Sequence, residues 1–309
     1  MFYFEKLEDP NHPLLGPTLK GLKLWKIWQT DQSTSGFFKK YYIHIFGALF
    51  VVSQYIELWF IRNDLELALR NLSVTMLSTI CIVKAASFIF WQKKWGFLIE
   101  YISNLEKHQI SKKDSSTSSI IGDYTKYSRK ITYFYWGLVT ATVLTVILAP
   151  LFGFLSSAYH RHVILNGTAP YPEILSSWLP FDRTRGFGYW ISILEHSAIC
   201  IYGGGVVANY DSNAVVSMSF FNGQLKILKK NCARLFTENT RIVGYDEAVK
   251  RITECHNHHV GLIKSRSCEI AIFHHLFSST LNTLLSPVMF LYVIICSLMI
   301  CASAVQFST

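Results

Sequence analysis

The residues best suited to metal chemistry form one cluster in the last quarter of the chain. Residues 255–259 read Cys-His-Asn-His-His, and Cys268 and the histidine pair 274–275 follow. Cysteine and histidine are common ligands of zinc, and His256 and His259 share a helical face at the i, i+3 spacing. A zinc site also needs a fourth ligand and supporting hydrogen bonds, which this pattern does not supply. The cluster therefore predicts a polar helix face, and we expect no bound metal or cofactor.

Other catalytic patterns are missing from the sequence as well. It contains no nucleophile elbow, no paired catalytic carboxylates and no dinucleotide fingerprint. The run Gly203-Gly204-Gly205 lacks the following Lys-Ser/Thr of a phosphate-binding loop. A membrane di-iron oxidase remains as a remote enzyme alternative, but it would need further histidine boxes with a different spacing. The sequence therefore predicts that the protein is not an enzyme.

Five long apolar stretches interrupt the chain. They are Tyr41–Phe60, Leu67–Phe90, Ile131–Leu155, Tyr189–Val216 and Ile272–Val305. Each reaches the roughly 20 residues that a helix needs to cross a bilayer. Only 16% of the residues are charged, against about 25% in soluble domains. We therefore predict an all-α, polytopic membrane bundle with five spans.

The positive charges predict the orientation of these spans. Segments 1–40, 92–130 and 219–271 hold 23 of the 29 Lys and Arg residues, whereas the loop 156–188 holds three. Because cytosolic loops carry the excess of Lys and Arg, the N-terminus is expected in the cytosol. The sequon at Asn166 then lies in the outer loop, and Asn166 is the predicted glycosylation site. The net charge of +9 is expected to face anionic membrane lipid rather than nucleic acid.

This orientation divides the chain into four parts. They are a cytosolic N-terminal segment with an amphipathic helix (1–40), spans one to four with the outer loop 156–188 (41–218), a cytosolic helical anchor segment (219–271), and span five with the chain end (272–309). The pattern of Pro17–Gln29 predicts a helix that lies in the membrane interface or, alternatively, packs on protein. The glycines at 203–205 predict a close approach of helices or a local bend.

Helical periods also continue beyond three of the spans. Trp91–His108 has apolar residues at helical spacing and is expected to continue the second span. Residues 109–122 are rich in serine and predict a mobile connector. Phe220–Leu235 is expected to prolong the fourth span, and Glu247–His259 to begin a long helix that leads to the fifth. These extensions predict a cytosolic helical bundle.

Several segments, taken in order, resemble the insect odorant receptors over nearly the whole chain. They are Leu24–Trp28, Lys84 with Trp91–Lys94, Trp178–Asp182 (Trp-Leu-Pro-Phe-Asp), the stretch from His258 to Phe277, Ser297–Cys301 and Phe307–Ser308. A gustatory receptor has the same architecture and is the alternative. The Trp-Leu-Pro-Phe-Asp stretch favours the odorant branch.

The resemblance implies a function as well as a fold. Members of this family have seven spans and a cytosolic N-terminus, and they assemble with a common co-receptor into tetrameric, odorant-gated, nonselective cation channels. The implied partners are a volatile odorant, the co-receptor and membrane lipid, with the plasma membrane of olfactory neurons as the location. The resemblance also implies two spans after Thr309, including the pore helix, so we expect that these 309 residues, expressed with the co-receptor, give no odorant-evoked current of their own specificity.

The family's odorant pocket lies in the outer half of each subunit. By topology its walls here would come from the early part of span two, the late part of span three and the early part of span four. The implied ligand-binding residues are Met76, Thr79, Thr145, Phe152, Phe154, His196, Ile199 and Tyr202.

Overall fold

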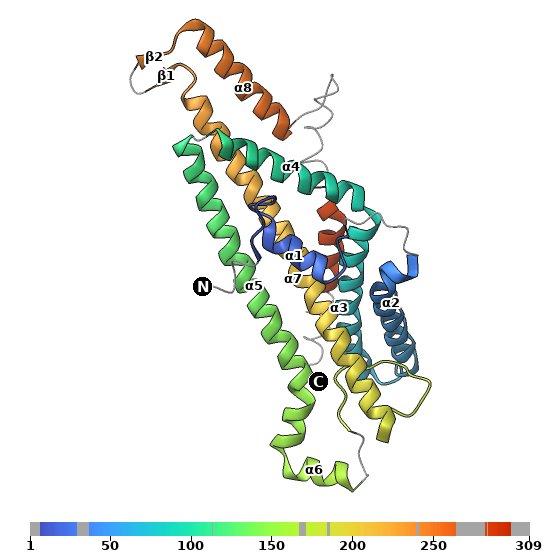
Figure 1. Ribbon diagram of the computed structural model, residues 1–309. Helices are drawn as coiled ribbons and strands as arrows, with labels where there is room; N and C mark the ends of the chain where they lie inside the picture. Colours follow the sequence, from blue (N-terminus) through green and yellow to red (C-terminus); the bar gives the residue numbers. More distant parts are fainter. Residues whose placement is uncertain are drawn as a thin grey trace. The chain divides into compact units, whose positions relative to one another are not determined.

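The computed structural model describes residues 7–29, 37–112, 114–166, 171–183, 186–238, 241–263, 282 and 284–297. Almost all of these residues are helical (Figure 1). The elements are α1 (Gly16–Leu24), α2 (Phe37–Phe60), α3 (Leu65–Phe90), α4 (Gln92–Ser111), α5 (Ser115–Ser156), α6 (Ala158–Leu165), α7 (Gly186–Ala233), β1 (Thr237–Glu238), β2 (Arg241–Ile242) and α8 (Tyr245–Ile263). The two strands form a short antiparallel pair.

Helices α2, α3, α5 and α7 are long and apolar enough to cross a membrane, and they are the four such helices in the described part of the chain. The four corresponding stretches and the all-α membrane fold are thus confirmed. Within the fifth predicted span, Leu284–Ser297 is a shorter apolar helix. Apart from residue 282, the rest of that span, together with Cys268 and the pair 274–275, lies outside the described residues.

The chain divides into two compact units. Unit 1 comprises Met1–Lys20, Trp91–Phe134 and Asp211–Pro287, and unit 2 comprises Gly21–Phe90, Tyr135–Tyr210 and Val288–Thr309. Unit 2 therefore holds α2, α3 and the first part of α7, whereas unit 1 holds α4, α8 and the last part of α7.

Three consecutive glycines of α7 face three different neighbours in unit 2. A methyl group added at Gly203 would touch the Cys81 sulfur at 3.5 Å, and one at Gly205 would overlap the Trp25 indole ring. At Gly204 it would meet Val143 of α5. The prediction that these glycines permit close packing is therefore confirmed for Gly204 and Gly205, where an added methyl group would lie 2.5 Å from Val143 and 2.1 Å from the Trp25 ring.

Two local predictions were wrong, and the first concerns the end of the second span. The structure ends α3 at Phe90 and starts α4 at Gln92, because Trp91 leaves the helical region with φ −106° and ψ 28°. Helix α4 buries Trp95 and Ile102 completely in unit 1. Because α4 is a separate helix, its apolar face can turn toward the core of unit 1. This explains the helix break at Trp91.

The second wrong prediction is the mobile connector at 109–122. Nearly all of it is helical, because α4 runs to Ser111 and α5 starts at Ser115. The Asp114 carboxylate accepts hydrogen bonds from the Thr117 hydroxyl at 2.6 Å and from the Ser116 amide at 3.2 Å. The Thr117 hydroxyl bond is the main reason that the pKa of Asp114 falls to about 2. Asp114 is thus the N-cap of α5.

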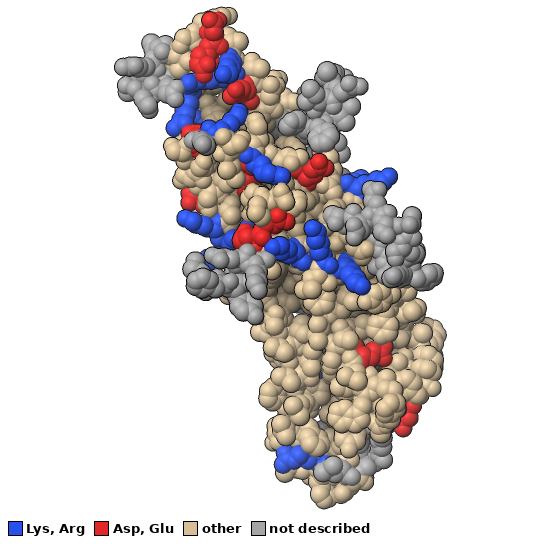
Figure 2. Space-filling model, in the orientation of Figure 1, with Lys and Arg blue, Asp and Glu red and all other residues tan. Residues whose placement is uncertain are grey.

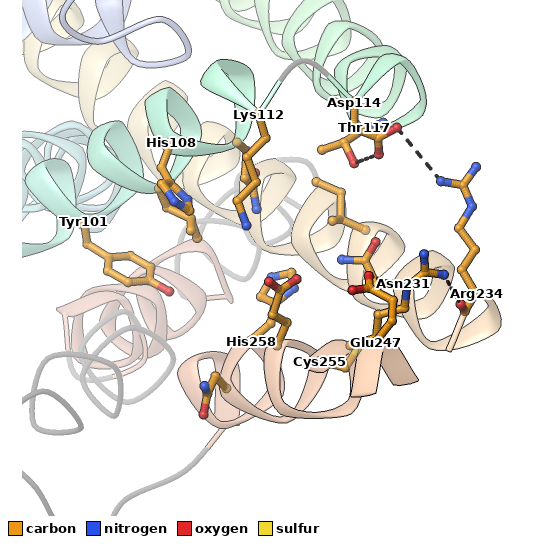
Figure 3. Close-up of a pocket in the computed structure, with 16 residues that line it drawn as sticks. Tyr101, His108, Lys112, Asp114, Thr117, Asn231, Arg234, Glu247, Cys255 and His258 are labelled. Carbon is orange, nitrogen blue, oxygen red and sulfur yellow. Dashed lines mark hydrogen bonds and ion pairs between the residues drawn. The ribbon is translucent and has the colours of Figure 1, made fainter. Parts of the chain in front are cut away.

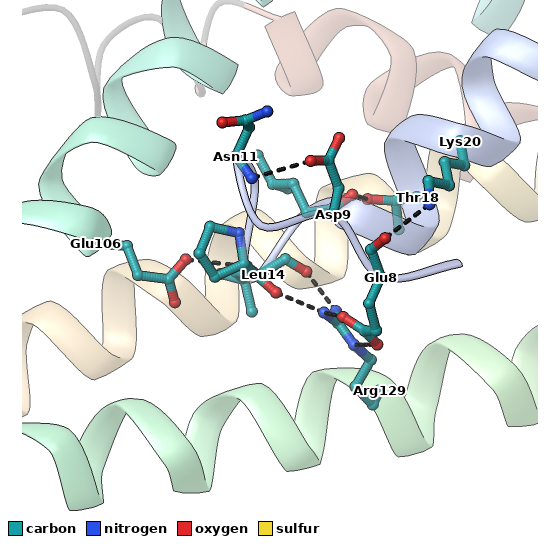
Figure 4. A network of polar contacts seen from close by, with 10 residues as sticks. Glu8, Asp9, Asn11, Leu14, Thr18, Lys20, Glu106 and Arg129 are labelled. Atoms are coloured by element: carbon teal, nitrogen blue, oxygen red, sulfur yellow. Dashed lines mark hydrogen bonds and ion pairs between the residues drawn. The ribbon is translucent and has the colours of Figure 1, made fainter. Parts of the chain in front are cut away.

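The N-terminal segment of unit 1 is held by an ion pair and several hydrogen bonds (Figure 4). Arg129 of α5 pairs with Glu8 at 2.5 Å and donates to the Leu14 carbonyl at 2.5 Å. The fully buried Glu106 of α4 accepts the Leu14 amide at 2.9 Å and the Tyr124 hydroxyl at 3.2 Å. Segment 7–20 is therefore packed on protein, which favours packing over the membrane interface for this stretch.

The fold around this segment should become less stable as the pH rises. Burial raises the pKa of Glu106 above its ordinary value of 4.5, although the hydrogen bond from the Leu14 amide lowers it in part. The folded protein therefore binds the Glu106 proton more tightly than the unfolded chain does, and folding loses stability from pH 4.5 up to the raised pKa. Hydrogen exchange of the Leu14 amide, corrected for its intrinsic rate, should become faster over this interval.

The matched variant is Glu106→Gln, which keeps the shape of the side chain and removes its charge. In that variant the protection of the Leu14 amide should no longer change with pH. An identical pH dependence in the variant would show that another group titrates.

Candidate functional site

A buried polar cluster lies where α2 and α7 of unit 2 meet segment 171–183. His196 of α7 and Ser177 of the segment are fully buried. The Leu175 amide donates to Nδ1 of His196 at 3.4 Å, and Nε2 of His196 lies 2.9 Å from the Ser177 hydroxyl. Because Nδ1 accepts, Nε2 carries the hydrogen of the neutral ring and donates it to Ser177.

Segment 171–183 is also fastened to α2. Its Arg183 pairs with Glu57 of α2 at 2.5 Å and with Glu173 of the segment at 3.1 Å. The Trp178 amide donates to the Ser53 carbonyl at 3.2 Å. These bonds satisfy polar groups that would otherwise be buried alone, and they hold the segment over the ends of α2 and α7.

The buried side-chain amide of Gln54, on α2, is a polar group of this region that no contact within the described residues explains. It lies one helical turn beyond Phe50, whose ring packs edge-on against His196 at 5.7 Å. Gln54 is 1% exposed. Neither atom of its amide has a hydrogen-bond partner among the described residues. Burying an unpaired amide costs about 1–3 kcal/mol, so such a group calls for an explanation by bound water or ligand.

Sequence reasoning missed Gln54. A polar amide in the middle of the apolar stretch Tyr41–Phe60 was the available signal, because polar groups within spans usually face a cavity or a partner. On α3 the buried Asn71 is similar, since its Nδ2 atom is also unpaired within the described part of the chain.

Five of the implied ligand-binding residues lie on α3 and α7. His196, Ile199 and Tyr202 are buried on α7, and the Tyr202 hydroxyl lies 2.7 Å from Nδ1 of His44. Met76 and Thr79 are partly buried on α3. The Thr79 hydroxyl lies 3.0 Å from the Tyr55 hydroxyl, so α2 contacts residues of both helices.

The other three implied residues lie on α5 and are not brought to this cluster. Thr145 is exposed and donates to its own helix at the Ala141 carbonyl, 2.9 Å away. Phe152 is 60% exposed, and Phe154 is partly exposed. The rest of the described chain buries no residue in the most apolar window of α5. Figure 2 shows a wide surface over the spans that has few charged side chains.

The predicted glycosylation site is accessible. Asn166 follows α6 and is exposed, with its Nδ2 atom 3.0 Å from Nδ1 of His162. Residues 167 and 168 of the sequon lie outside the described residues.

Unit 1 contains a cleft of about 690 Å³ between α4, the start of α5, the end of α7 and α8 (Figure 3). Its charged side chains have both signs, for example Lys112 and Arg251 against Asp114 and Glu247. Mixed charges of this kind select neither anions nor cations.

The Cys/His cluster lies on α8 beside this cleft. His256 and His259 are exposed, and Nε2 of His258 lies 3.1 Å from the side-chain oxygen Oε1 of Gln224. Within the described residues no three His, Cys, Asp or Glu side chains are grouped as metal ligands. The exposed histidines give α8 a polar face.

Comparison with known proteins decides the family. Residues 64–309 match the family model of the 7tm Odorant receptor. The chain belongs to the 7tm odorant receptor family. This assignment confirms the resemblance found in the sequence and favours the odorant branch over the gustatory alternative. Odorant receptors are not enzymes, so the expectation of a protein without enzymatic activity is confirmed as well. With its apolar helices, this odorant receptor is a multi-pass membrane protein.

Solved structures give two further similarities. The insect olfactory receptor OR5 from Machilis hrabei is 16% identical, with a TM-score of 0.48, and the match covers 94% of this odorant receptor and 77% of that chain. The same receptor in complex with eugenol is 14% identical, with a TM-score of 0.48 and coverage of 91% and 80%. None of the curated proteins matches this chain.

Proposed function

We propose that this odorant receptor binds a small volatile odorant in unit 2, beside Gln54 and beneath segment 171–183. The observation that carries the proposal is the buried amide of Gln54, which has no hydrogen-bond partner among the described residues. Small-molecule sites are mostly apolar, with a few placed polar groups that orient the ligand. Gln54 provides one donor group and one acceptor for this purpose.

The chemistry of Gln54 defines the class of ligand. Its amide can donate to the oxygen of a ketone or ester and can accept from an alcohol or phenol. The Phe50 ring one turn away supplies apolar surface. A volatile molecule with one oxygen function and a hydrocarbon body therefore suits the site. Of the implied pocket residues, Met76, Thr79, Ile199 and Tyr202 are proposed wall residues, and His196 positions the segment.

Odorant binding is proposed to open a nonselective cation channel that the chain forms with a co-receptor in the plasma membrane. The charge distribution supports a cytosolic N-terminus, since 23 of 29 Lys and Arg residues then lie on the cytosolic side. Unit 1, with α4 and α8, would then lie in the cytosol and contribute to contacts between subunits. The residues on α5 (Thr145, Phe152 and Phe154) would face lipid or a neighbouring subunit.

The channel proposal is tested by expressing the full-length receptor with the co-receptor and recording currents during an odorant panel. The panel pairs volatile alcohols, ketones and esters with matched hydrocarbons. We expect oxygenated odorants to evoke currents carried by both Na⁺ and K⁺ without a G-protein pathway. Currents that vanish on G-protein inhibition, or no response above that of the co-receptor alone, would contradict the proposal.

The topology gives a separate prediction. A tag at Met1 should be invisible to antibody on intact cells and should appear after permeabilisation. Asn166 should carry a glycan that endoglycosidase removes, seen as a shift on a gel. Asn166→Gln is the control, because it should remove that shift while leaving the accessibility of the tag unchanged. Surface staining of the tag on intact cells would reverse the proposed orientation.

A further inference from the structure

The last turns of α7 and helix α8 pair in antiparallel fashion within unit 1. Nε2 of His258 lies 3.1 Å from the side-chain oxygen Oε1 of Gln224. Ten residues further along the chain, just after the end of α7, the Arg234 carbonyl accepts a bond of 2.9 Å from Arg251. Residue numbers therefore rise along α7 as they fall along α8. The residues between these two contacts lie in one interface between α7 and α8.

Two cysteines lie in this interface. Cys255 is buried in a small apolar cluster with Leu228 of α7. Cys232 lies one helical turn beyond Leu228 on the same face of α7, and it is exposed. The Cys232 and Cys255 side chains are within hydrogen-bonding reach of each other. Burial, with a contribution from Cys232, raises the pKa of Cys255 to about 11.

We propose that Cys232 and Cys255 form an oxidative modification site, at which a peroxide converts the two thiols into a disulfide that joins α7 to α8. The exposed Cys232 reacts first and the buried Cys255 resolves the product. This assignment is independent of the odorant site, which lies in unit 2.

The reaction balances with hydrogen peroxide as the oxidant. The Cys232 thiolate attacks one peroxide oxygen, the O–O bond breaks, and the leaving hydroxide takes up a proton to become water. Cys232 is then a sulfenic acid. The Cys255 thiol loses its proton and attacks this sulfur, so the S–O bond breaks, a second water leaves and the S–S bond forms. Two thiols and one peroxide thus give one disulfide and two waters.

The order of the two steps follows from the surroundings of the thiols. The thiolate is the reactive form, and the raised pKa keeps Cys255 protonated at neutral pH. Cys232 is the thiol that solvent reaches. On the proposed orientation both lie in the reducing cytosol, where thiol reductants make such a disulfide transient. While it lasts, the bond would fix α8 against α7 at the border of the unit 1 cleft.

The experiment treats the purified receptor with hydrogen peroxide, blocks the remaining thiols by alkylation, and digests it with trypsin. Trypsin separates the two cysteines into peptides 231–234 and 252–264, each with a single cysteine. We expect mass spectrometry to find these peptides joined with the loss of two hydrogens, and to find them separate after dithiothreitol. Both peptides recovered alkylated after peroxide, or joined to other cysteines, would overturn the proposal.

Three variants distinguish the roles of the cysteines. Cys255→Ser should leave a sulfenic acid on Cys232 that dimedone traps, and Cys232→Ser should leave Cys255 unmodified. Cys200→Ser, in the span region, should form the linked peptides as the wild type does. Dimedone labelling of Cys255 rather than Cys232 would overturn the assigned order. If a variant does not fold, the mass-spectrometric measurement on the wild-type receptor still tests the proposal.

Discussion

Replacing Gly205 with valine should remove most of the folded receptor from the membrane. A side chain at this position overlaps the indole ring of Trp25, and the rigid ring cannot turn away as a flexible chain could. Overpacking of a tight core costs about 1–3 kcal/mol for added methylenes, and a direct overlap costs more. Since proteins are stable by about 5–15 kcal/mol, the yield of monodisperse receptor and its melting temperature should both fall strongly.

Gly137→Val on α5 is the matched control. A methyl group at Gly137 would meet no described atom within 4 Å, so this change adds the same side chain to a helix without the overlap. Detergent-solubilised samples of both variants are compared by size-exclusion chromatography and thermal unfolding. Equal losses in the two variants would mean that valine acts on the helix itself and that the contact with Trp25 is unimportant.

Replacing Gln54 with leucine should make the receptor more stable and less sensitive to odorants at the same time. Leucine removes two buried polar atoms that have no partner among the described residues, which should stabilise the fold by about 1–3 kcal/mol. The odorant loses one hydrogen bond worth about 1 kcal/mol, so the half-activating concentration of alcohols and ketones should rise about fivefold. Responses to matched hydrocarbons should be unchanged.

Asn63→Leu serves as the control, since this amide is exposed in the turn between α2 and α3. It should change neither the melting temperature nor the dose–response curve by a comparable amount. A more stable Gln54→Leu receptor with unaltered sensitivity to every odorant would show that Gln54 does not contact ligand.

The sequence predicted the membrane spans well because hydropathy is a local property. The apolar stretch Tyr41–Phe60 and helix α2 end at the same residue, and the continuation of α7 to Ala233 followed the helical period. The break at Trp91 was not predictable in this way, because it depends on where Trp95 is buried in the tertiary structure. The cap at Asp114 had a sequence signal, since Asp-Ser-Ser-Thr is typical of a helix start.

The candidate site was harder to predict, because sequence does not fix how a helix is rotated in a bundle. His196 was implied as a ligand contact, whereas both its ring nitrogens bond to segment 171–183. Phe152 was implied on the same grounds and is mostly exposed. Gln54 was missed because its significance comes from tertiary burial without a partner.

The contacts that hold segment 171–183 against α2 would also affect how quickly a response ends. On the proposed function, an odorant held near Gln54 would leave past this segment, which is joined to α2 by the Arg183–Glu57 ion pair and the Trp178 amide. Release of the odorant would then require these contacts to open, so the dissociation rate should depend on them as well as on the odorant's own bonds. Loosening Arg183 would shorten the residence time and speed recovery between odour pulses, even with equilibrium affinity little changed.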